Sequence, residues 1–245
     1  MPTARSRAQP RTRVVRDEIR EELLDAALAE FAEKGFDGAS TRAIARRIGA
    51  HQPQIHYHFE SKEALWCAAV DHLFAKLGQE MGQLDLTSFA TDSVDPSLRA
   101  VRAATFAEMI RHFVRFAAAH PELNRIMVHE ATVSSERLDW MVEHHVRPLY
   151  EAGRSMWKRL QRDGVAAPIN DRLFHYVLVG AASILFVNAP EARLLLGVEP
   201  TLPRWVKAHA DGLVAILLPG AERAIRPTGR RAPGRAAKKS ARKSG

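Results

Sequence analysis

Residues 31–65 read FAEKGFDGASTRAIARRIGAHQPQIHYHFESKEAL. In this stretch Ser40 is a favoured N-cap residue, and the apolar pattern after it predicts a short helix over Thr41–Ile48, ended by the next glycine. A second short helix is predicted over Pro53–Phe59, because a proline suits the first helical position, where its missing N–H would be unpaired in any case. Two short helices joined by a glycine-containing turn are typical of a helix-turn-helix.

A longer helix is predicted in front of this pair. Apolar residues recur at helical spacing from Ile19 to Phe31, and Gly35 ends the run. Acidic residues between 17 and 22 lie in the first turns, where carboxylates favour the positive end of the helix dipole. We therefore expect this helix to begin at about Asp17.

The rest of the chain also has helical patterns, and no segment is convincing as a strand. Ser61 is expected to cap a fourth helix, and residues 87–96 are expected to form a loop. Further helices are predicted over residues 97–120, 122–129, 135–163 with a break or bend near Pro148, 171–188 and 205–218.

The positive charge of the chain is concentrated at its two ends. The formal net charge is +8, yet residues 1–16 hold five arginines and no acid, and residues 219–245 hold nine Lys or Arg against Glu222. The part between them has a small net negative charge. Basic ends on an acidic body suggest arms that meet a polyanion, and they would add a salt-sensitive term to DNA binding.

Other features favour a cytoplasmic protein. Cys67 is the only cysteine, so no intrachain disulfide can form, which fits a reducing compartment. The uncharged stretch Val177–Pro190 is shorter than a membrane-spanning helix needs, and the arginine-rich start lacks the apolar segment of a secretory signal. We expect no membrane association.

Several runs carry a family resemblance. They are FAEKGF at 31–36, STRAIA at 40–45, the glycine at 49, IHYHF at 55–59 and SKEAL at 61–65. Together they resemble the DNA-binding region of the TetR family of transcriptional regulators over about residues 17–66. The helices that follow are similar to that family in architecture rather than in motif.

The resemblance implies an all-α fold with an N-terminal helix-turn-helix DNA-binding domain and a C-terminal helical ligand-binding and dimerisation domain. We expect four parts: a basic disordered arm over 1–16, the helix-turn-helix domain over 17–66, the helical domain over 67–218 and a basic disordered tail over 219–245. The expected function is a ligand-responsive repressor that binds a palindromic operator in double-stranded DNA as a homodimer.

A recognition helix presents polar side chains to base edges while its other face is held in the core. Ile55 and Phe59, four residues apart, can hold the second short helix in place. The polar side chains that remain for the groove are those of Gln52, Gln54, His56 and Tyr57.

A glutamine can pair with adenine and an arginine with guanine. The resemblance implies that Arg42 and Gln52 read bases, with Gln54 as a third reader. It also implies phosphate contacts by Thr41, His56, Tyr57, His58 and Lys62. His51 joins the expected DNA-binding set, although the family commonly has a small hydroxyl residue there, and a tyrosine where His56 stands. His58 is as well suited to packing, and Arg46 and Arg47 are expected on a solvated face.

Dimerisation is expected through the last two helices, paired as a four-helix bundle. The residues expected there are Val177, Val179, Leu185, Val187, Val206, Leu213 and Leu217, which could instead complete the monomer core. The expected effector pocket lies among Phe106, Ile110, Phe113, Met127, Trp140, Met141 and Trp157. Such side chains suggest an apolar or aromatic effector, although each is by itself more typical of ordinary core.

Three other functions are alternatives to a ligand-responsive repressor. A metal sensor could use His112, His120, His129, His144, His145 and His175, but their spacing matches no ligand motif, and we predict no metal and no cofactor. An enzyme is not expected, because His129, Glu130 and Glu143 form no recognisable catalytic set and no phosphate-binding loop is present. An architectural DNA-binding protein that grips DNA with its basic tails is the main alternative.

Overall fold

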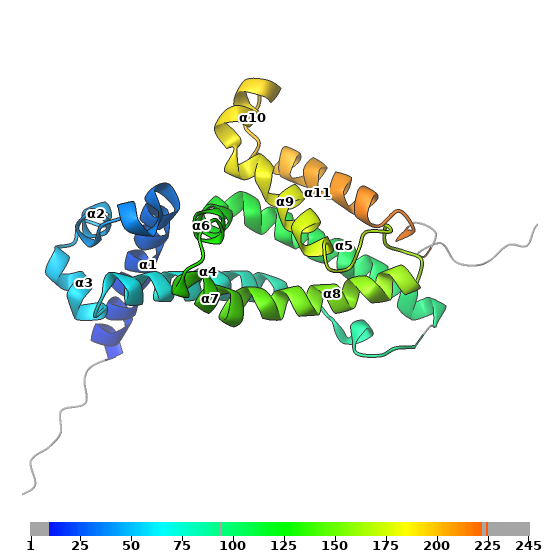
Figure 1. Cartoon of the computed structure of the whole chain (residues 1–245), viewed down its shortest axis with the longest axis horizontal. Helices are drawn as coiled ribbons and strands as arrows, with labels where there is room; N and C mark the ends of the chain where they lie inside the picture. The colour runs from blue at the N-terminus through cyan, green and yellow to red at the C-terminus, as the bar shows by residue number, and fades with distance from the viewer. Residues whose placement is uncertain (1–9, 94, 222–223, 225–245) are drawn as a thin grey trace, which may run out of the picture.

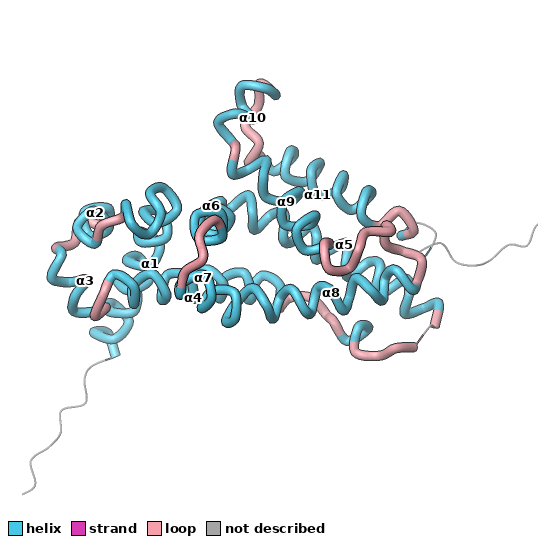
Figure 2. The backbone as a smooth tube through the Cα atoms, viewed as in Figure 1, coloured by secondary structure: helices cyan, strands magenta, loops and turns pink. Residues whose placement is uncertain are grey.

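The computed structural model describes residues 10–93, 95–221 and 224, except the side chains of residues 10–17, 53, 54 and 56. The described residues form helices and connecting loops, without a strand, as predicted (Figures 1 and 2). The elements are α1 (Pro10–Gly38), α2 (Thr41–Arg47), α3 (Gln52–His58), α4 (Lys62–Met81), the 3₁₀ turn η1 (Thr87–Phe89), α5 (Pro96–Ala119), α6 (Pro121–Ala131), α7 (Glu136–Met141), the π-helical η2 (Val142–Val146), α8 (Arg147–Arg162), α9 (Phe174–Val187), α10 (Ala189–Leu196) and α11 (Pro203–Leu217).

The first helix differs from its prediction at its N-terminal end. It begins at Pro10 instead of Asp17, so the expected disordered arm is wrong for residues 10–16, while residues 1–9 lie outside the described residues. Its regular part ends at Gly35 as predicted, since that residue has φ 66° and ψ 178°. A positive φ of this kind is accessible to glycine without the steric penalty that a Cβ brings.

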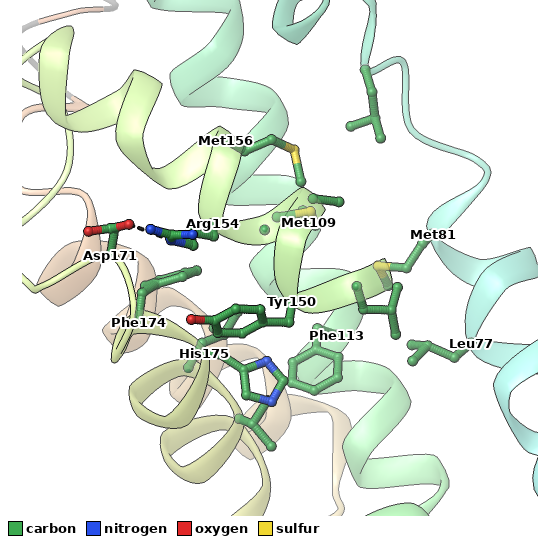
Figure 3. A pocket seen from close by; sticks show the side chains of 16 residues that line it. Leu77, Met81, Met109, Phe113, Tyr150, Arg154, Met156, Asp171, Phe174 and His175 are labelled. Atoms are coloured by element: carbon green, nitrogen blue, oxygen red, sulfur yellow. Dashed lines mark hydrogen bonds and ion pairs between the residues drawn. The ribbon is translucent and has the colours of Figure 1, made fainter. Parts of the chain in front are cut away.

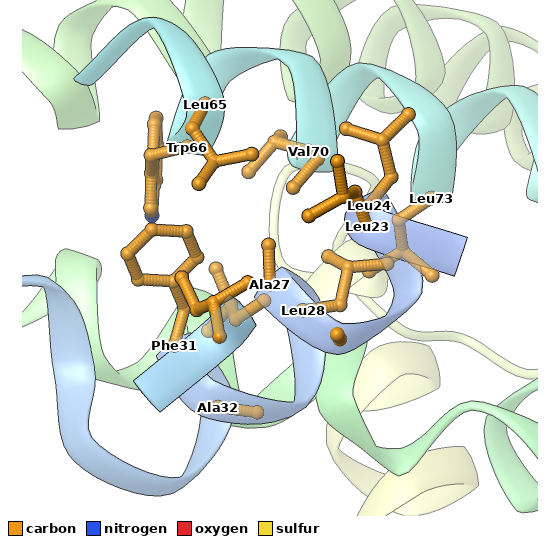
Figure 4. Packing of buried hydrophobic residues seen from close by; sticks show 14 of the residues in the cluster. Leu23, Leu24, Ala27, Leu28, Phe31, Ala32, Leu65, Trp66, Val70 and Leu73 are labelled. Carbon is orange, nitrogen blue, oxygen red and sulfur yellow. The ribbon is translucent and has the colours of Figure 1, made fainter. Parts of the chain in front are cut away.

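The N-terminal core joins α1, α2, α3 and α4. Leu23, Ala27 and Phe31 of α1 face Leu65 and Trp66 of α4, and all five side chains are buried (Figure 4). Ile55 and Phe59 are also buried in this core, so they anchor the second short helix as predicted.

The fourth helix connects the N-terminal core to the rest of the molecule. It runs without interruption from Lys62 to Met81, across the boundary that we expected at residue 66 (Figure 1). Its first half packs on α1, and its second half reaches α5. The two expected domains therefore share one rigid helix.

The second core, which we call the body core, lies among α5, α8, α9 and α11. Phe106 of α5 is at its centre, with ring centroids 5.9 Å from both Trp157 and Phe174. The rings of Trp157 and Phe174 are stacked, with centroids 3.9 Å apart. Burial of large apolar side chains of this kind is the main stabilising term for such a bundle.

The predicted bend near Pro148 is present as a change of helix type. Residues 142–146 adopt a π-helical turn between α7 and α8, directly before the proline. Pro148 has no N–H to donate to the carbonyl four residues earlier, so the regular hydrogen-bond ladder cannot continue there.

Two features of the C-terminal part differ from the sequence predictions. Residues 189–196 form α10, which projects away from the other helices (Figure 1). The sequence predicts no helix over these residues, but Pro190 occupies the first turn of α10, where a proline is tolerated. The expected disordered tail begins too early, because Gly220 is buried and its N–H donates to the carbonyl of Val165 at 3.0 Å. Residues 222–223 and 225–245 lie outside the described residues.

In the part of the chain that the structure describes, no single helix has the length and apolar character needed to cross a bilayer. The pair formed by α9 and α10 is long and apolar enough when the two helices are taken together, but the pair is bent by 73°.

Candidate functional site

The surface formed by α2 and α3 is built by local signals in the sequence. Ser40 accepts a hydrogen bond from the Ala43 N–H at 3.1 Å, which fixes the start of α2. Gly49, with φ 66°, makes the turn toward α3. These two features determine where α2 begins and in which direction the chain enters α3.

The beginnings of α2 and α3 come together on one exposed face. The Gln52 Nε2 and Thr41 Oγ1 atoms are 3.5 Å apart, at the long limit of a hydrogen bond. Arg42 next to Thr41 is exposed, and so is Tyr57, with 76% of its surface accessible. We call Thr41, Arg42, Gln52 and Tyr57 the recognition face.

The other expected DNA-binding residues differ in how they lie. His51 is exposed and His58 is half-buried, with its ring edge-on to Tyr57 at 5.1 Å. The side chains of Gln54 and His56 lie outside the described residues, although their backbone belongs to α3. Lys62 is half-buried and has a packing role that the sequence did not indicate: its Nζ donates to the Asp37 carbonyl at 3.3 Å and lies 4.5 Å from the centroid of the Phe36 ring.

An ion-pair network holds α2 against α1. The Glu30 side chain, 2% exposed, accepts hydrogen bonds from Lys34 Nζ at 2.7 Å and from Arg47 Nη2 at 3.0 Å. Arg46 and Arg47 are both exposed as expected, and Arg47 also pairs with Glu33 at 2.6 Å. Burial opposes ionisation of Glu30, but the bonds from Lys34 and Arg47 outweigh it and lower the pKa of this carboxyl.

Replacement of Glu30 is expected to give a pH-dependent loss of stability. A carboxyl whose pKa is lowered by folding stabilises the native state above its unfolded pKa, and this contribution disappears as the pH falls through the folded value. Glu30→Gln should lower the free energy of unfolding by about 1–3 kcal/mol at pH 7 and by much less at pH 3. Urea denaturation at both pH values measures the difference.

Glu33→Gln is the matched control, because Glu33 bonds the same arginine but is half exposed. Its effect should stay below about 1 kcal/mol at both pH values. Equal losses for the two variants, or a Glu30→Gln loss that persists unchanged in acid, would contradict the assigned role of Glu30.

A cavity of about 210 Å³ lies beneath the far half of α4 (Figure 3). Its walls are mainly apolar and come mostly from α4 and α5 and from α8 and α9, two parts of the chain that are distant in the sequence. The lining residues are Leu77, Met81, Leu86, Met109, Phe113, Leu149, Tyr150, Ala152, Gly153, Arg154, Met156, Asp171, Phe174, His175, Leu178 and Val179.

The polar groups of the cavity lie at two places. At one end, Arg154 Nε bonds Asp171 Oδ2 at 2.5 Å (Figure 3). In the middle, the His175 ring lies beside Tyr150 and Phe113 (Figure 3), and burial lowers the pKa of its imidazole. The cavity is therefore suited to small molecules that are mostly hydrocarbon.

The expected pocket residues are only partly on this cavity. Phe113 lines it, and Met127 lines a smaller hollow of about 70 Å³ beside it. The other five are elsewhere: Phe106, Ile110 and Trp157 are fully buried in the body core, and Trp140 and Met141 pack in the N-terminal core. The spacing of apolar residues along a helix predicts which residues are buried, but it does not distinguish residues that line a cavity from residues that pack in the core. The missed residues on α4 and α9 meet the cavity through tertiary packing.

The histidines considered for a metal site are dispersed. Most pair singly with an acid or a carbonyl: His112 with Glu80, His120 with Glu122, His145 with Asp71 and His144 with the Trp140 carbonyl. Within the described part of the chain, no three His, Cys, Asp or Glu side chains are grouped so that they could hold a metal ion.

Comparisons with known proteins agree with this arrangement. The family model described as bacterial regulatory proteins, tetR family, matches residues 23–69, which include the recognition face. The transcriptional regulator BetI of Serratia proteamaculans is 30% identical over 175 residues, covering 66% of this chain and 83% of its own. The transcriptional repressor NicS of Pseudomonas putida is 28% identical over 177 residues, covering 71% and 77%.

A solved structure is similar along most of the chain. The crystal structure of AibR, in complex with isovaleryl coenzyme A and operator DNA, has a TM-score of 0.56 at 16% identity and covers 82% of this chain and 98% of its own. At that identity the likeness concerns the fold. The relatives and the family model together show that this chain is a member of the TetR family of bacterial transcription regulators, with a helix-turn-helix as its DNA-binding unit.

Proposed function

We propose that this protein is a ligand-responsive repressor that binds a palindromic operator as a homodimer and is released when a small apolar or aromatic molecule enters the cavity. The observation that carries the proposal is that one helix, α4, serves both sites. Its N-terminal half packs in the N-terminal core, and its Leu77 and Met81 line the cavity. The relative named NicS is described as a repressor, and the AibR structure holds both a ligand and operator DNA. Such a regulator acts where the DNA is, which we propose to be the cytoplasm.

The proposed dimer uses the apolar faces that α9 and α11 leave exposed. On α9, Val177 and Ile184 lie on one exposed side, seven residues apart and so two helical turns from each other. On α11, Trp205 and Ile216 are exposed in the same way. A large exposed apolar surface on a folded protein marks an interaction site. Two helices from each subunit would then form a four-helix bundle.

Of the seven residues expected at the dimer interface, Val177 alone is among the exposed residues of the proposed face. Val206, Leu213 and Leu217 are buried in the body core of the single chain, and Val179 lines the cavity. The remaining three residues do not form a face: Val177 is exposed, Leu185 is partly buried against the body core, and Val187 is half-buried. The exposed leucines Leu194, Leu195 and Leu196 on α10 add apolar surface next to this face.

The proposed release is a population shift. An effector in the cavity pushes on Leu77 and Met81, and because α4 is continuous, its first turns move with the N-terminal core. The effector acts only to the extent that it binds the non-matching state more tightly than the DNA-bound state. The two recognition faces of the dimer would then no longer match successive major grooves.

Base reading by the recognition face is tested with Arg42→Ala and Gln52→Ala. Each should lower the affinity for the operator by about 1–3 kcal/mol and relax the sequence preference at one position of each half-site. Selection of bound fragments from random DNA, followed by titration of the operator and its single-base variants, measures both effects.

Arg46→Ala is the matched control, because Arg46 is exposed one turn after Arg42 on the same helix and borders Glu30 and Lys34 of α1. It should change affinity for operator and random DNA alike. Equal losses on both kinds of DNA for Arg42→Ala and Gln52→Ala would favour the architectural alternative. Footprinting separates the two functions as well, since a repressor protects a discrete palindrome and an architectural protein coats the duplex.

A further inference from the structure

We infer that the effector of this cavity is an uncharged, largely hydrocarbon molecule that carries one hydroxyl or carbonyl group, and that this group forms a hydrogen bond with His175. The inference rests on the proposed function for its regulatory meaning. The chemistry of the ligand is argued from the cavity alone.

The size of the space sets the size of the ligand. The cavity of about 210 Å³ is the main space, and the hollow of about 70 Å³ beside it shares part of its wall. The shared residues are Leu77, Phe113, Leu149, His175 and Val179. Because an apolar protein cavity of about 150 Å³ holds benzene, this space fits one ring with a short alkyl chain.

The charged groups at the end of the cavity are already paired. Asp171 accepts from Arg154 at 2.5 Å and lies 3.3 Å from Lys158 Nζ, while Glu151 lies 3.9 Å from Arg154. Two positive and two negative charges therefore balance. An anionic ligand would have to displace Asp171 from Arg154 and would lose its own hydration, so the site favours a neutral molecule.

His175 is the polar group that remains for a ligand. Its ring is in edge-on contact with the Tyr150 ring, 5.7 Å between centroids, and no hydrogen bond from its nitrogens to the described residues is found. The Tyr150 hydroxyl is already directed to the Arg172 carbonyl, at 3.4 Å. Burial lowers the pKa of His175, so the ring is neutral at pH 7 and offers one donor and one acceptor. A hydroxyl or carbonyl group on the ligand satisfies one of these.

The test is calorimetric titration of the full-length protein with three matched probes: 4-propylphenol, propylbenzene and 4-propylbenzoate. The wild-type protein should bind 4-propylphenol about tenfold more tightly than propylbenzene, the usual worth of one hydrogen bond, and at least tenfold more tightly than 4-propylbenzoate. In His175→Phe, which keeps an aromatic ring, the advantage of the phenol over propylbenzene should fall below about twofold. His175→Gln, which keeps a hydrogen-bonding side chain, should retain most of it.

Three results would overturn the inference: tightest binding of 4-propylbenzoate, an undiminished phenol advantage in His175→Phe, or no binding of any probe. Operator release, measured in parallel by fluorescence anisotropy of labelled DNA, separates this inference from the proposed function. A carboxylate that binds and releases DNA refutes the ligand class and leaves the regulator intact. A phenol that binds through His175 but never changes DNA affinity refutes the regulatory role of the cavity and leaves the ligand class intact.

Discussion

Ile184→Glu is expected to convert the protein into a monomer that no longer holds a palindromic operator. Ile184 is 54% exposed on α9, in the middle of the apolar face proposed for the dimer. A carboxylate there would lie unpaired in the four-helix interface, and burial of an unpaired charge is strongly unfavourable. The dissociation constant of the dimer should rise at least a hundredfold, about 3 kcal/mol. Sedimentation velocity over a range of protein concentrations measures it.

The loss of dimers should weaken operator binding by three orders of magnitude or more, because a single recognition face contacts only one half-site. Val133→Glu is the control. Val133, like Ile184, is an exposed β-branched apolar residue, but it lies in the turn between α6 and α7. It should remain dimeric and bind the operator normally. An Ile184→Glu protein that sediments like the parent would place the interface elsewhere.

Arg102→Met is expected to cause the largest loss of stability of any single change considered. The Arg102 side chain is 2% exposed and donates to the carbonyls of Ser88 and Thr91, at 2.8 and 2.6 Å, and to Asp163 at 3.2 Å. It therefore ties the loop before α5 to the end of α8. Methionine fills a similar volume but leaves the buried Asp163 carboxylate and the Ser88 carbonyl without the Arg102 donor, while the Thr91 carbonyl keeps a hydrogen bond from Arg159. Breaking a buried ion pair in this way costs about 3–5 kcal/mol.

Urea denaturation of the full-length protein measures this loss. Arg99→Met is the matched control, one turn earlier on the same helix, where the buried Arg99 Nε has no hydrogen-bond partner. That replacement should change the free energy of unfolding by less than about 1 kcal/mol. If both variants lose the same stability, arginine packing rather than the Arg102 bonds holds the loop.

Local signals in the sequence were sufficient for most of the fold. Ser40, Gly49 and Ser61 mark helix ends through capping and a positive φ, which depend on neighbouring residues only. The helices predicted from them agree with the structure to within a residue or two. The same local reasoning indicated which face of the second short helix is buried, since Ile55 and Phe59 are four residues apart.

The cavity and the dimer face could not be derived in this way. α9 is apolar on more than one side, because it meets the cavity, the body core and solvent along its length. Periodicity shows that such a helix is apolar but not which side meets which neighbour. His175 is the clearest case, since it was noted as a possible metal ligand and its setting depends on Tyr150 and Phe113 from two other helices.

The continuity of α4 has a consequence for how such a molecule behaves when both of its partners are present. If the effector and the DNA both bias the position of this one helix, thermodynamic linkage makes their antagonism mutual. The factor by which the bound effector lowers the affinity for the duplex equals the factor by which the bound duplex lowers the affinity for the effector. The threshold concentration for induction would then depend on how strong each promoter site is, so sites of unequal strength would switch in a fixed order.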